Sequence, residues 1–185
     1  MSEFIVSLGA PAGVVADRIG PKAANLAALA RAGLPTPGGF CLTADAYRRQ
    51  CETLGLEPLL ARFGAASPPE ARRLSVEIRL KLYQEPIAQK ILEPLLAAWC
   101  EQRQAHALGA VRSSALIEDR AGANFAGQFE SFLGLASETD FLTAVRACWA
   151  ALWTTNARRY MDAHDVDAGE TAMAVLPGSM PLAAM

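Results

Sequence analysis

The 185-residue sequence predicts an α+β fold, in which helices pack on a mixed β-sheet. Several long segments carry apolar residues at the three- to four-residue spacing of amphipathic helices. Short apolar runs at residues 4–8 (FIVSL) and 171–176 (TAMAVL) have the character of buried strands. Hydrophobic residues make up 52 % of the chain and charged residues 19 %, a balance that supports a buried core.

In the first third of the chain, proline, glycine and threonine mark where the predicted elements begin and end. A strand at residues 4–8 is followed by a helix that begins at Pro21, a favourable first helical position, and stops at Gly33. A short extended piece at residues 40–42 leads into a second helix, which Thr43 is expected to cap. These signals are local and predict the order strand, helix, strand, helix.

The middle of the chain, about residues 55–105, is expected to be a helical insertion that serves as scaffold. The segment Ser67-Pro-Pro-Glu70 has the pattern of a capping box and predicts a helix to about residue 83. A further helix is expected over residues 85–104. Both are amphipathic and lack any chemical signature.

The character of the sequence changes at Leu108, where a motif region of about residues 108–136 begins. It is expected to hold two strands joined by a loop rich in glycine, alanine and asparagine. The later elements are expected in this order: helices at residues 138–153 and 156–164, then the strand at residues 171–176.

Composition excludes several classes of function. The formal net charge is −2 without a long basic run, so a nucleic-acid surface is not expected. We find no signal peptide and no apolar stretch of membrane-spanning length, which predicts a cytoplasmic protein that does not enter the membrane. The cysteines have no metal-ligand or CxxC spacing and are interpreted as small buried thiols: Cys41, Cys51, Cys100 and Cys148.

Two clusters could carry chemistry. Gly20-Pro21-Lys22 lies at a helix start, where unpaired N–H groups and the helix dipole suit a phosphate, although such a lysine is commonly a solvated surface residue. The second cluster runs from Val111-Arg112-Ser113-Ser114 through Glu118-Asp119 to Gly127-Gln128. Its arginine fork and glycine-containing loop suit a mobile flap over a polyphosphate. The alternative is a surface loop held by an ion pair from Arg112 to the acidic pair.

Neither histidine has the surroundings expected of a catalytic or phosphorylated residue. His106 lies near a helix end, and His164 lies in the charged segment DAHDVD (residues 162–167). That segment lacks the glycine and terminal glutamate of a calcium loop, so no metal site is assigned. No catalytic residue is assigned from spacing.

Three segments together resemble the N-terminal ATP-binding domain of the dikinase-type phosphotransferases, a family that includes phosphoenolpyruvate synthase, pyruvate phosphate dikinase and rifampicin phosphotransferase. The segments are GPKAANLAALARAGLPTPGGFCLTADAY (residues 20–47), VRSSALIEDRAGANFAGQFESFLGL (111–135) and ARRYMDAHDVDAGETAMAV (157–175). The second of these is long and specific. The resemblance implies that residues 1–185 form a single N-terminal lobe of an ATP-grasp-like fold.

The resemblance also implies roles for particular residues. By matching position, Lys22 and Arg112 would contact the ATP phosphates, and Gly127 and Ser131 would line the phosphate loop. Further loop contacts are expected from a second set: Ser113, Glu118, Asp119 and Gln128. In this family ATP phosphorylates a histidine on a separate domain, which passes the group to or from pyruvate, or to an antibiotic hydroxyl.

Three positions depart from the pattern of the family. Pro21 replaces a glycine and so removes a backbone N–H. Gly178 stands near the position of a glutamine that meets the adenine edge, and Pro177 is expected to interrupt the strand before it. The departures at Pro177 and Gly178 put adenine recognition in doubt.

The second ATP-grasp lobe, the phosphohistidine domain and the barrel of the family are expected to be absent from this chain. ATP with Mg²⁺ is the expected ligand, with the Mg²⁺ ligands in the absent lobe. The chain alone is therefore expected to be incomplete for catalysis. It could work with a separate chain that supplies the second lobe or the phosphohistidine domain, could self-associate, or could be a non-catalytic nucleotide-sensing or protein-interaction module.

Overall fold

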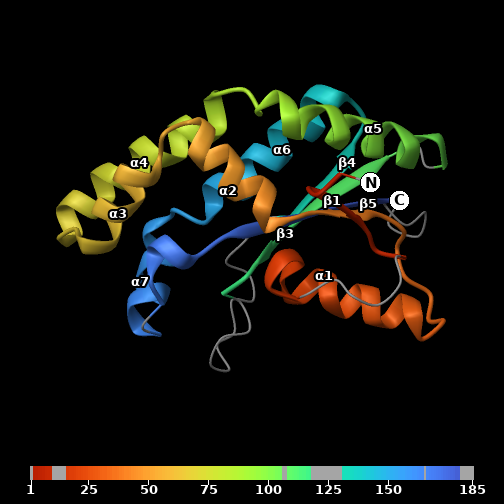
Figure 1. Ribbon diagram of the computed structural model, residues 1–185, viewed down its shortest axis with the longest axis horizontal. Helices are drawn as coiled ribbons and strands as arrows, with labels where there is room; N and C mark the ends of the chain where they lie inside the picture. Colours follow the sequence, from red (N-terminus) through yellow and green to blue (C-terminus); the bar gives the residue numbers. More distant parts are fainter. Residues whose placement is uncertain (1, 10–15, 106–107, 118–130, 165, 180–185) are drawn as a thin grey trace.

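In the computed structural model, the described residues are 2–9, 16–105, 108–117, 131–164 and 166–179. This part of the chain forms helices on both sides of one five-stranded sheet (Figure 1), which confirms the α+β class. The elements are β1 Ile5–Ser7, α1 Ala16–Arg31, β2 Phe40–Leu42, α2 Ala44–Thr53, α3 Glu57–Ala65, α4 Pro68–Gln84, α5 Gln89–Ala105, β3 Gly109–Ala115, β4 Ser131–Leu135, α6 Glu138–Ala151, α7 Thr155–Ala163, a short 3₁₀ turn Ala168–Glu170 and β5 Met173–Ser179.

The sheet has the strand order β1-β2-β5-β3-β4. Every pairing between these described strands is antiparallel, where a mixed sheet was expected. The longest ladder joins β3 and β5, which pair from Gly109↔Ser179 to Ala115↔Met173. Local sequence patterns locate strands but do not give the direction in which distant strands meet, which explains the difference.

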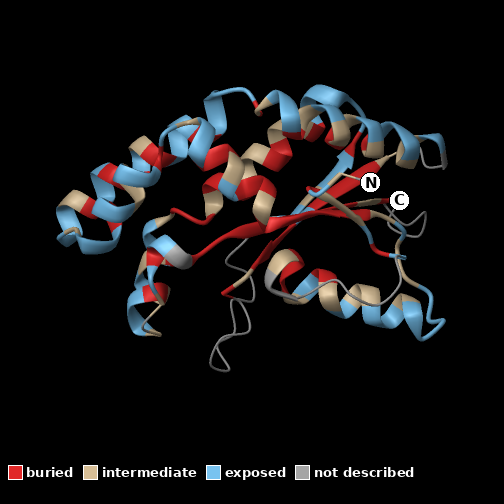
Figure 2. Cartoon of the chain, in the orientation of Figure 1, coloured by how far each residue is buried: buried red, intermediate tan, exposed pale blue. Residues whose placement is uncertain are grey.

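The two faces of the sheet are covered unequally. Helix α1 lies alone on one face, and α2, α4, α5 and α6 lie over the other (Figure 1). Side chains of β5 alternate accordingly: Val175 joins the large core under the helical layer, whereas Ala174 and Leu176 pack with Ile19 and Ala23 of α1. Figure 2 shows the buried residues gathered along the strands and along the helix faces that meet them.

Aromatic side chains fill the core of the helical layer. The indole N–H of Trp153 donates to the Tyr47 hydroxyl at 2.8 Å, so this buried polar pair is satisfied. The Trp153 ring meets Phe63 of α3 edge to face at 5.4 Å between centroids, and Trp99 stacks on Phe141 at 4.0 Å. These contacts tie α2, α3, α5 and α6 into one unit.

The helix that was expected to begin at Pro21 does so after a break at Gly20, where the backbone is not helical. Its stop at Gly33 is also confirmed. Gly33 has a φ of 72°, and the Leu34 N–H donates to the Leu29 carbonyl at 3.1 Å, which is the bonding of a Schellman end.

The predicted capping box at Ser67 is wrong in its bonding. Ser67 does precede α4, but its side chain makes no capping hydrogen bond. Glu70 instead accepts a hydrogen bond from Arg62 of α3 at 3.0 Å, so a tertiary ion pair takes the carboxylate that the box would use. Thr43 likewise precedes α2 without a side-chain cap.

Strand β5 is not interrupted at Pro177, contrary to expectation. It continues to Ser179, and Pro177 pairs with Val111 of β3. The Ser179 N–H points away from β3, to the Gly38 carbonyl at 3.3 Å. Because N–H groups alternate in direction along a strand, the nitrogen of Pro177 also points away from β3, so the missing donor does not break that ladder.

Three of the four thiols are buried as expected, but Cys100 on α5 is exposed. Burial raises the pKa of Cys51 to about 12 and that of Cys41 further still, so both remain neutral thiols at physiological pH.

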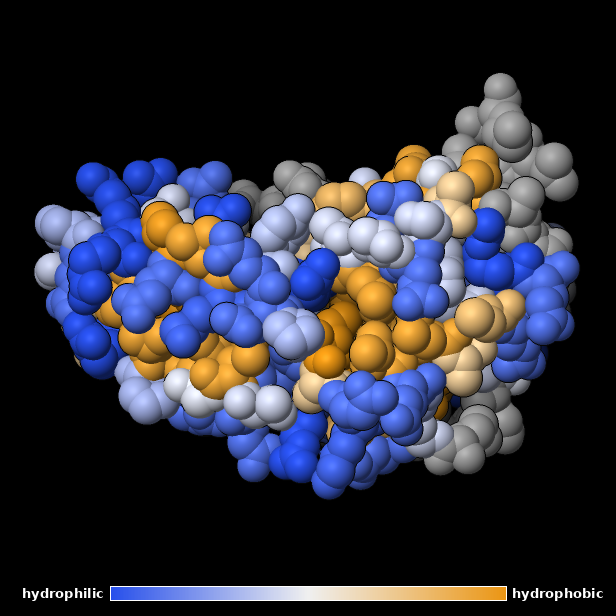
Figure 3. Space-filling model, turned by 90° about the horizontal axis from the view of Figure 1, so that it is seen from above, coloured by the Kyte–Doolittle hydropathy of each residue, from blue (hydrophilic) through white to orange (hydrophobic). Residues whose placement is uncertain are grey.

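The exposed apolar residues of α4 are Val76, Leu80 and Tyr83. Seen from the helical side, apolar patches lie within a largely hydrophilic rim (Figure 3). No helix among the described residues is long and apolar enough to span a membrane.

Candidate functional site

The two clusters singled out in the sequence meet at Gly20 and Ser114. Gly20 has φ 71° and ψ 166°, a conformation essentially confined to glycine. A Cβ placed there would lie 2.4 Å from Ser114 Oγ and 2.7 Å from the Ser114 carbonyl oxygen. Only a residue without a side chain therefore lets the start of α1 approach the end of β3 this closely.

Lys22 lies just beyond this contact. Its Nζ donates to the carbonyl oxygen of Ser113 at 3.3 Å, across 91 positions of sequence. Lys22 is exposed, whereas the Ser113 side chain is buried. Ser113 therefore contributes to this site through its backbone, and the ammonium group is held beside β3.

Arg112 and Ser131 are direct neighbours across β3 and β4. The other cross-strand partner of Arg112 is Leu176, which packs toward α1, so all three lie on the α1 face of the sheet. Arg112 and Ser131 are exposed. Arg112 has no hydrogen-bond or ion-pair partner among the described residues. Glu118 and Asp119, its alternative ion-pair partners, lie outside them.

A shallow hollow of about 20 Å³ lies beside Arg112, between α1 and the sheet. Its lining includes Leu8, Leu26, Leu176 and Gly178. Its lining is mainly apolar, and Arg112 is the one charged residue among the residues that line it. Such a hollow offers an apolar surface next to a cation, but it is too small to enclose a nucleotide.

The glycine at position 178 has a structural cause. A Cβ there would lie 3.2 Å from the Gly38 carbonyl oxygen, and a Cβ at Gly39 would lie 2.4 Å from the Pro177 carbonyl oxygen. The connection before β2 therefore runs against the end of β5. A side chain at position 178 would bring its Cβ tighter against that connection than in most protein contacts, so the connection would have to shift by a few tenths of an ångström.

The described residues hold no group of three or more His, Cys, Asp or Glu that could bind a metal ion. Ser114 Oγ is buried and has no hydrogen-bond partner among the described residues. The predicted contacts in the connecting loop lie outside the described residues: Glu118, Asp119, Gly127 and Gln128. Among the described residues, the charged side chains assigned to this site are those of Lys22 and Arg112, and both are cations.

Sequence reasoning located Lys22, Arg112 and Ser131 but missed what joins them. The decisive contact is that of Gly20 with Ser114, and the only signal for it was a glycine directly before the proline of a helix start. Apolar neighbours such as Leu176 could not be assigned to this face, because the register between β3 and β5 is a long-range property.

Comparison with known proteins adds independent information. The family profile described as "Pyruvate phosphate dikinase, AMP/ATP-binding domain" matches residues 16–180. The chain is 32 % identical over 173 residues to a phosphoenolpyruvate synthase of Aeropyrum pernix, covering 88 % of this chain and 21 % of that protein. It is 34 % identical over 167 residues to a rifampicin phosphotransferase of Streptomyces sviceus, covering 88 % and 19 % respectively. A prodigiosin-synthesizing transferase of Serratia marcescens is 34 % identical over 157 residues, covering 85 % and 16 %. The chain thus spans about a fifth of the length of these relatives.

Proposed function

The chain belongs to the family of pyruvate phosphate dikinase AMP/ATP-binding domains, and from this premise we propose that Lys22, Arg112 and Ser131 bind the phosphates of ATP. The observation that supports the proposal most strongly is their arrangement. Arg112 and Ser131 are paired across two strands, and Lys22 is held beside them by Ser113. Residues far apart in sequence thus form one exposed cationic surface.

The groups of this surface have complementary roles. The planar guanidinium of Arg112 would donate two parallel hydrogen bonds to phosphate oxygens, and the Lys22 ammonium group would add a compact positive charge. Ser131 would donate a hydrogen bond from its hydroxyl. The regular part of α1 begins at Pro21 in the same place, so the positive end of its dipole adds to the attraction. The loop residues Gly127 and Gln128 would complete the contacts.

In this proposal the chain binds and orients ATP, and other parts of a phosphotransferase complete the reaction. Transfer to a histidine carrier, and then to pyruvate or another acceptor, is the chemistry we propose for the whole assembly. Mg²⁺ would arrive with the phosphates and neutralise their charge, with its protein ligands on a second lobe. A location in the cytoplasm, where thiols stay reduced, fits this role.

We further propose that a second lobe, in this or a separate chain, covers the α1 face near β4. Strand β4 is an edge of the described sheet, and Leu133 on it is 54 % exposed. An exposed apolar residue on an edge strand favours contact with another surface. Self-association of the chain would use the same edge when no such lobe is present.

Calorimetric titration with a non-hydrolysable ATP analogue and Mg²⁺ tests the proposal. We expect 1:1 binding that weakens as ionic strength rises, because the contacts are between charges. Inorganic phosphate at the same concentration is the control and should bind more weakly, since it lacks the further phosphates. Absence of heat up to millimolar analogue would contradict the proposal and favour the non-catalytic protein-interaction alternative.

A further inference from the structure

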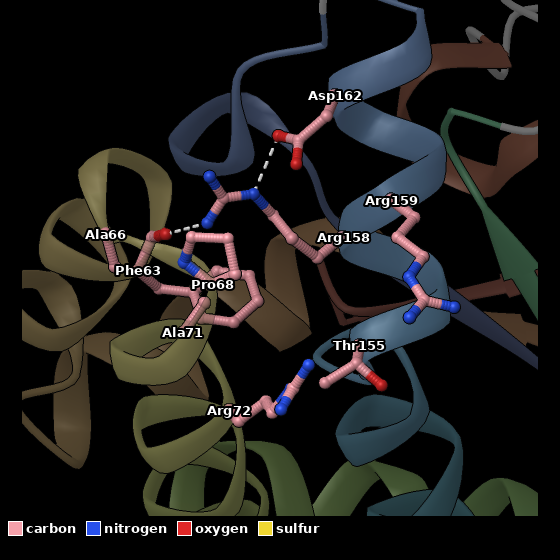
Figure 4. A pocket seen from close by; sticks show the side chains of 9 residues that line it. All are labelled: Phe63, Ala66, Pro68, Ala71, Arg72, Thr155, Arg158, Arg159 and Asp162. Carbon is pink, nitrogen blue, oxygen red and sulfur yellow. Dashed lines mark hydrogen bonds and ion pairs between the residues drawn. The ribbon is translucent and has the colours of Figure 1, made fainter.

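A second hollow, of about 230 Å³, lies between α3, α4 and α7 (Figure 4). We call it the α4–α7 pocket. None of its lining residues belongs to the sheet, so it is separate from the proposed ATP site. It is lined by Phe63, Ala66, Pro68, Ala71, Arg72, Thr155, Arg158, Arg159 and Asp162.

Arg158 has a structural role in this pocket. Its Nε donates to Asp162 Oδ1 at 2.7 Å, and its Nη1 donates to the Phe63 carbonyl oxygen. Its guanidinium also lies over the Phe63 ring, 5.2 Å from the centroid. Arg158 therefore joins α7 to α3, and its charge is balanced by the one carboxylate of the pocket.

The other two arginines are not balanced in this way. Arg72 comes from α4 and Arg159 from α7, and both are exposed. Neither has a hydrogen-bond or ion-pair partner in the described ranges of the chain. The pocket thus carries two unneutralised positive charges in a protein whose formal net charge is −2, which points to an anionic ligand.

Thr155 adds polar groups between these charges. Figure 4 shows its side chain between those of Arg72 and Arg159. It is the first residue of α7, so the first turn of that helix begins at the pocket. Its hydroxyl can donate a hydrogen bond to an oxyanion bound by the arginines, and the positive end of the helix dipole attracts the same oxyanion.

The opposite wall is apolar. Pro68, Ala66 and Ala71 line it and cover the buried Phe63 ring. At about 230 Å³ the pocket is smaller than the roughly 300–1,000 Å³ of drug-sized ligand sites, so it suits a compact ligand. A ligand that matches both walls has an oxyanion at one end and an apolar group at the other.

We propose that the α4–α7 pocket binds a small phosphate monoester, with its phosphate on Arg72, Arg159 and Thr155 and its apolar part against Pro68 and Ala71. Arginine pairs favour phosphate because the guanidinium fork matches two phosphate oxygens. This site is independent of the proposed ATP-binding function.

Phenyl phosphate is a suitable probe, followed by ¹⁵N NMR of the full 185-residue chain. We expect shifts of the amides of residues 70–72 and 155–159. Phenyl phosphate should bind at least about fivefold more tightly than inorganic phosphate, because the ring adds apolar contact. Equal binding of the two probes would overturn the monoester assignment and leave a free-phosphate site. The titration is repeated in Arg112→Ala, so that loss of the proposed ATP site cannot be mistaken for loss of this one.

The double variant Arg72→Gln/Arg159→Gln should weaken phenyl phosphate binding about tenfold or more, since two charge-assisted contacts are lost. Arg73→Gln is the matched control, because Arg73 neighbours Arg72 on α4 but pairs with Glu77 at 3.5 Å. It should change affinity by less than about twofold, as expected for a screened surface charge. Equal weakening by both variants, or none by the double variant, would overturn the proposal. All altered side chains are exposed, and thermal unfolding checks that the variants remain folded.

Discussion

Arg112→Ala is expected to reduce the affinity for an ATP analogue by about tenfold to a hundredfold, the effect of losing a charge-assisted hydrogen-bond pair. The fold should be unaffected, because the guanidinium is exposed and has no partner in the described structure. Isothermal titration with Mg²⁺ measures the affinity, and Arg112→Lys should recover part of it by restoring the charge without the fork.

Arg79→Ala provides the control for that variant. Arg79 is also exposed but lies on α4, over the other face of the sheet. Its removal changes the net charge by the same amount and should leave analogue binding within about twofold of the unaltered chain. If Arg79→Ala weakened binding as much as Arg112→Ala, the attraction would be a general effect of charge and not a site on β3.

Gly20→Ala is expected to destabilise the protein by about 3 kcal/mol, from backbone strain and overpacking together. The new Cβ would meet Ser114 Oγ at 2.4 Å and the Ser114 carbonyl at 2.7 Å, and a β-strand carbonyl cannot move aside as a flexible side chain does. Relieving this clash would require α1 to move away from β3. Nucleotide binding should therefore fall together with stability, as measured by urea unfolding and titration.

Gly33→Ala is the control for a positive φ without a close contact, and the ψ of 166° at Gly20 adds backbone strain that Gly33→Ala does not reproduce. Gly33 has a φ of 72°, close to the 71° of Gly20, but a Cβ at Gly33 would meet nothing within 4 Å. It should cost only about 1 kcal/mol, from the left-handed conformation alone. Similar losses in the two variants would show that the close approach of Gly20 to Ser114 does not hold the site together.

Elements whose chemistry is local could be predicted from the sequence. The helix start at Pro21 and its stop at Gly33 depend on backbone preferences of single residues, and both are as expected. The capping box was wrong in its bonding: Glu70 pairs with Arg62, which lies on another helix. Similarly, Pro177 remains within β5 because its nitrogen faces the Gly38 side of the strand.

Long-range features of the site could not be predicted in this way. That Arg112 lies opposite Ser131 depends on strand register, and that Lys22 reaches Ser113 depends on how α1 packs. No motif predicted the pocket between α4 and α7. Arg72 belongs to a helix without a chemical signature, and Arg159 lies in the third resembling segment, which gave it no role. Resemblance to a family identified the positions Lys22 and Arg112, but their proximity is a property of the fold.

The central claim is that two distant segments, residues 20–22 and 112–114, form one phosphate-binding surface with Ser131. The most direct measurement is an ¹⁵N NMR titration of the chain with a non-hydrolysable ATP analogue and Mg²⁺. The account predicts that the amides of Gly20, Lys22, residues 112–114 and Ser131 shift together, along one binding curve. Shifts confined to one segment, or found only around the α4–α7 pocket, would contradict it.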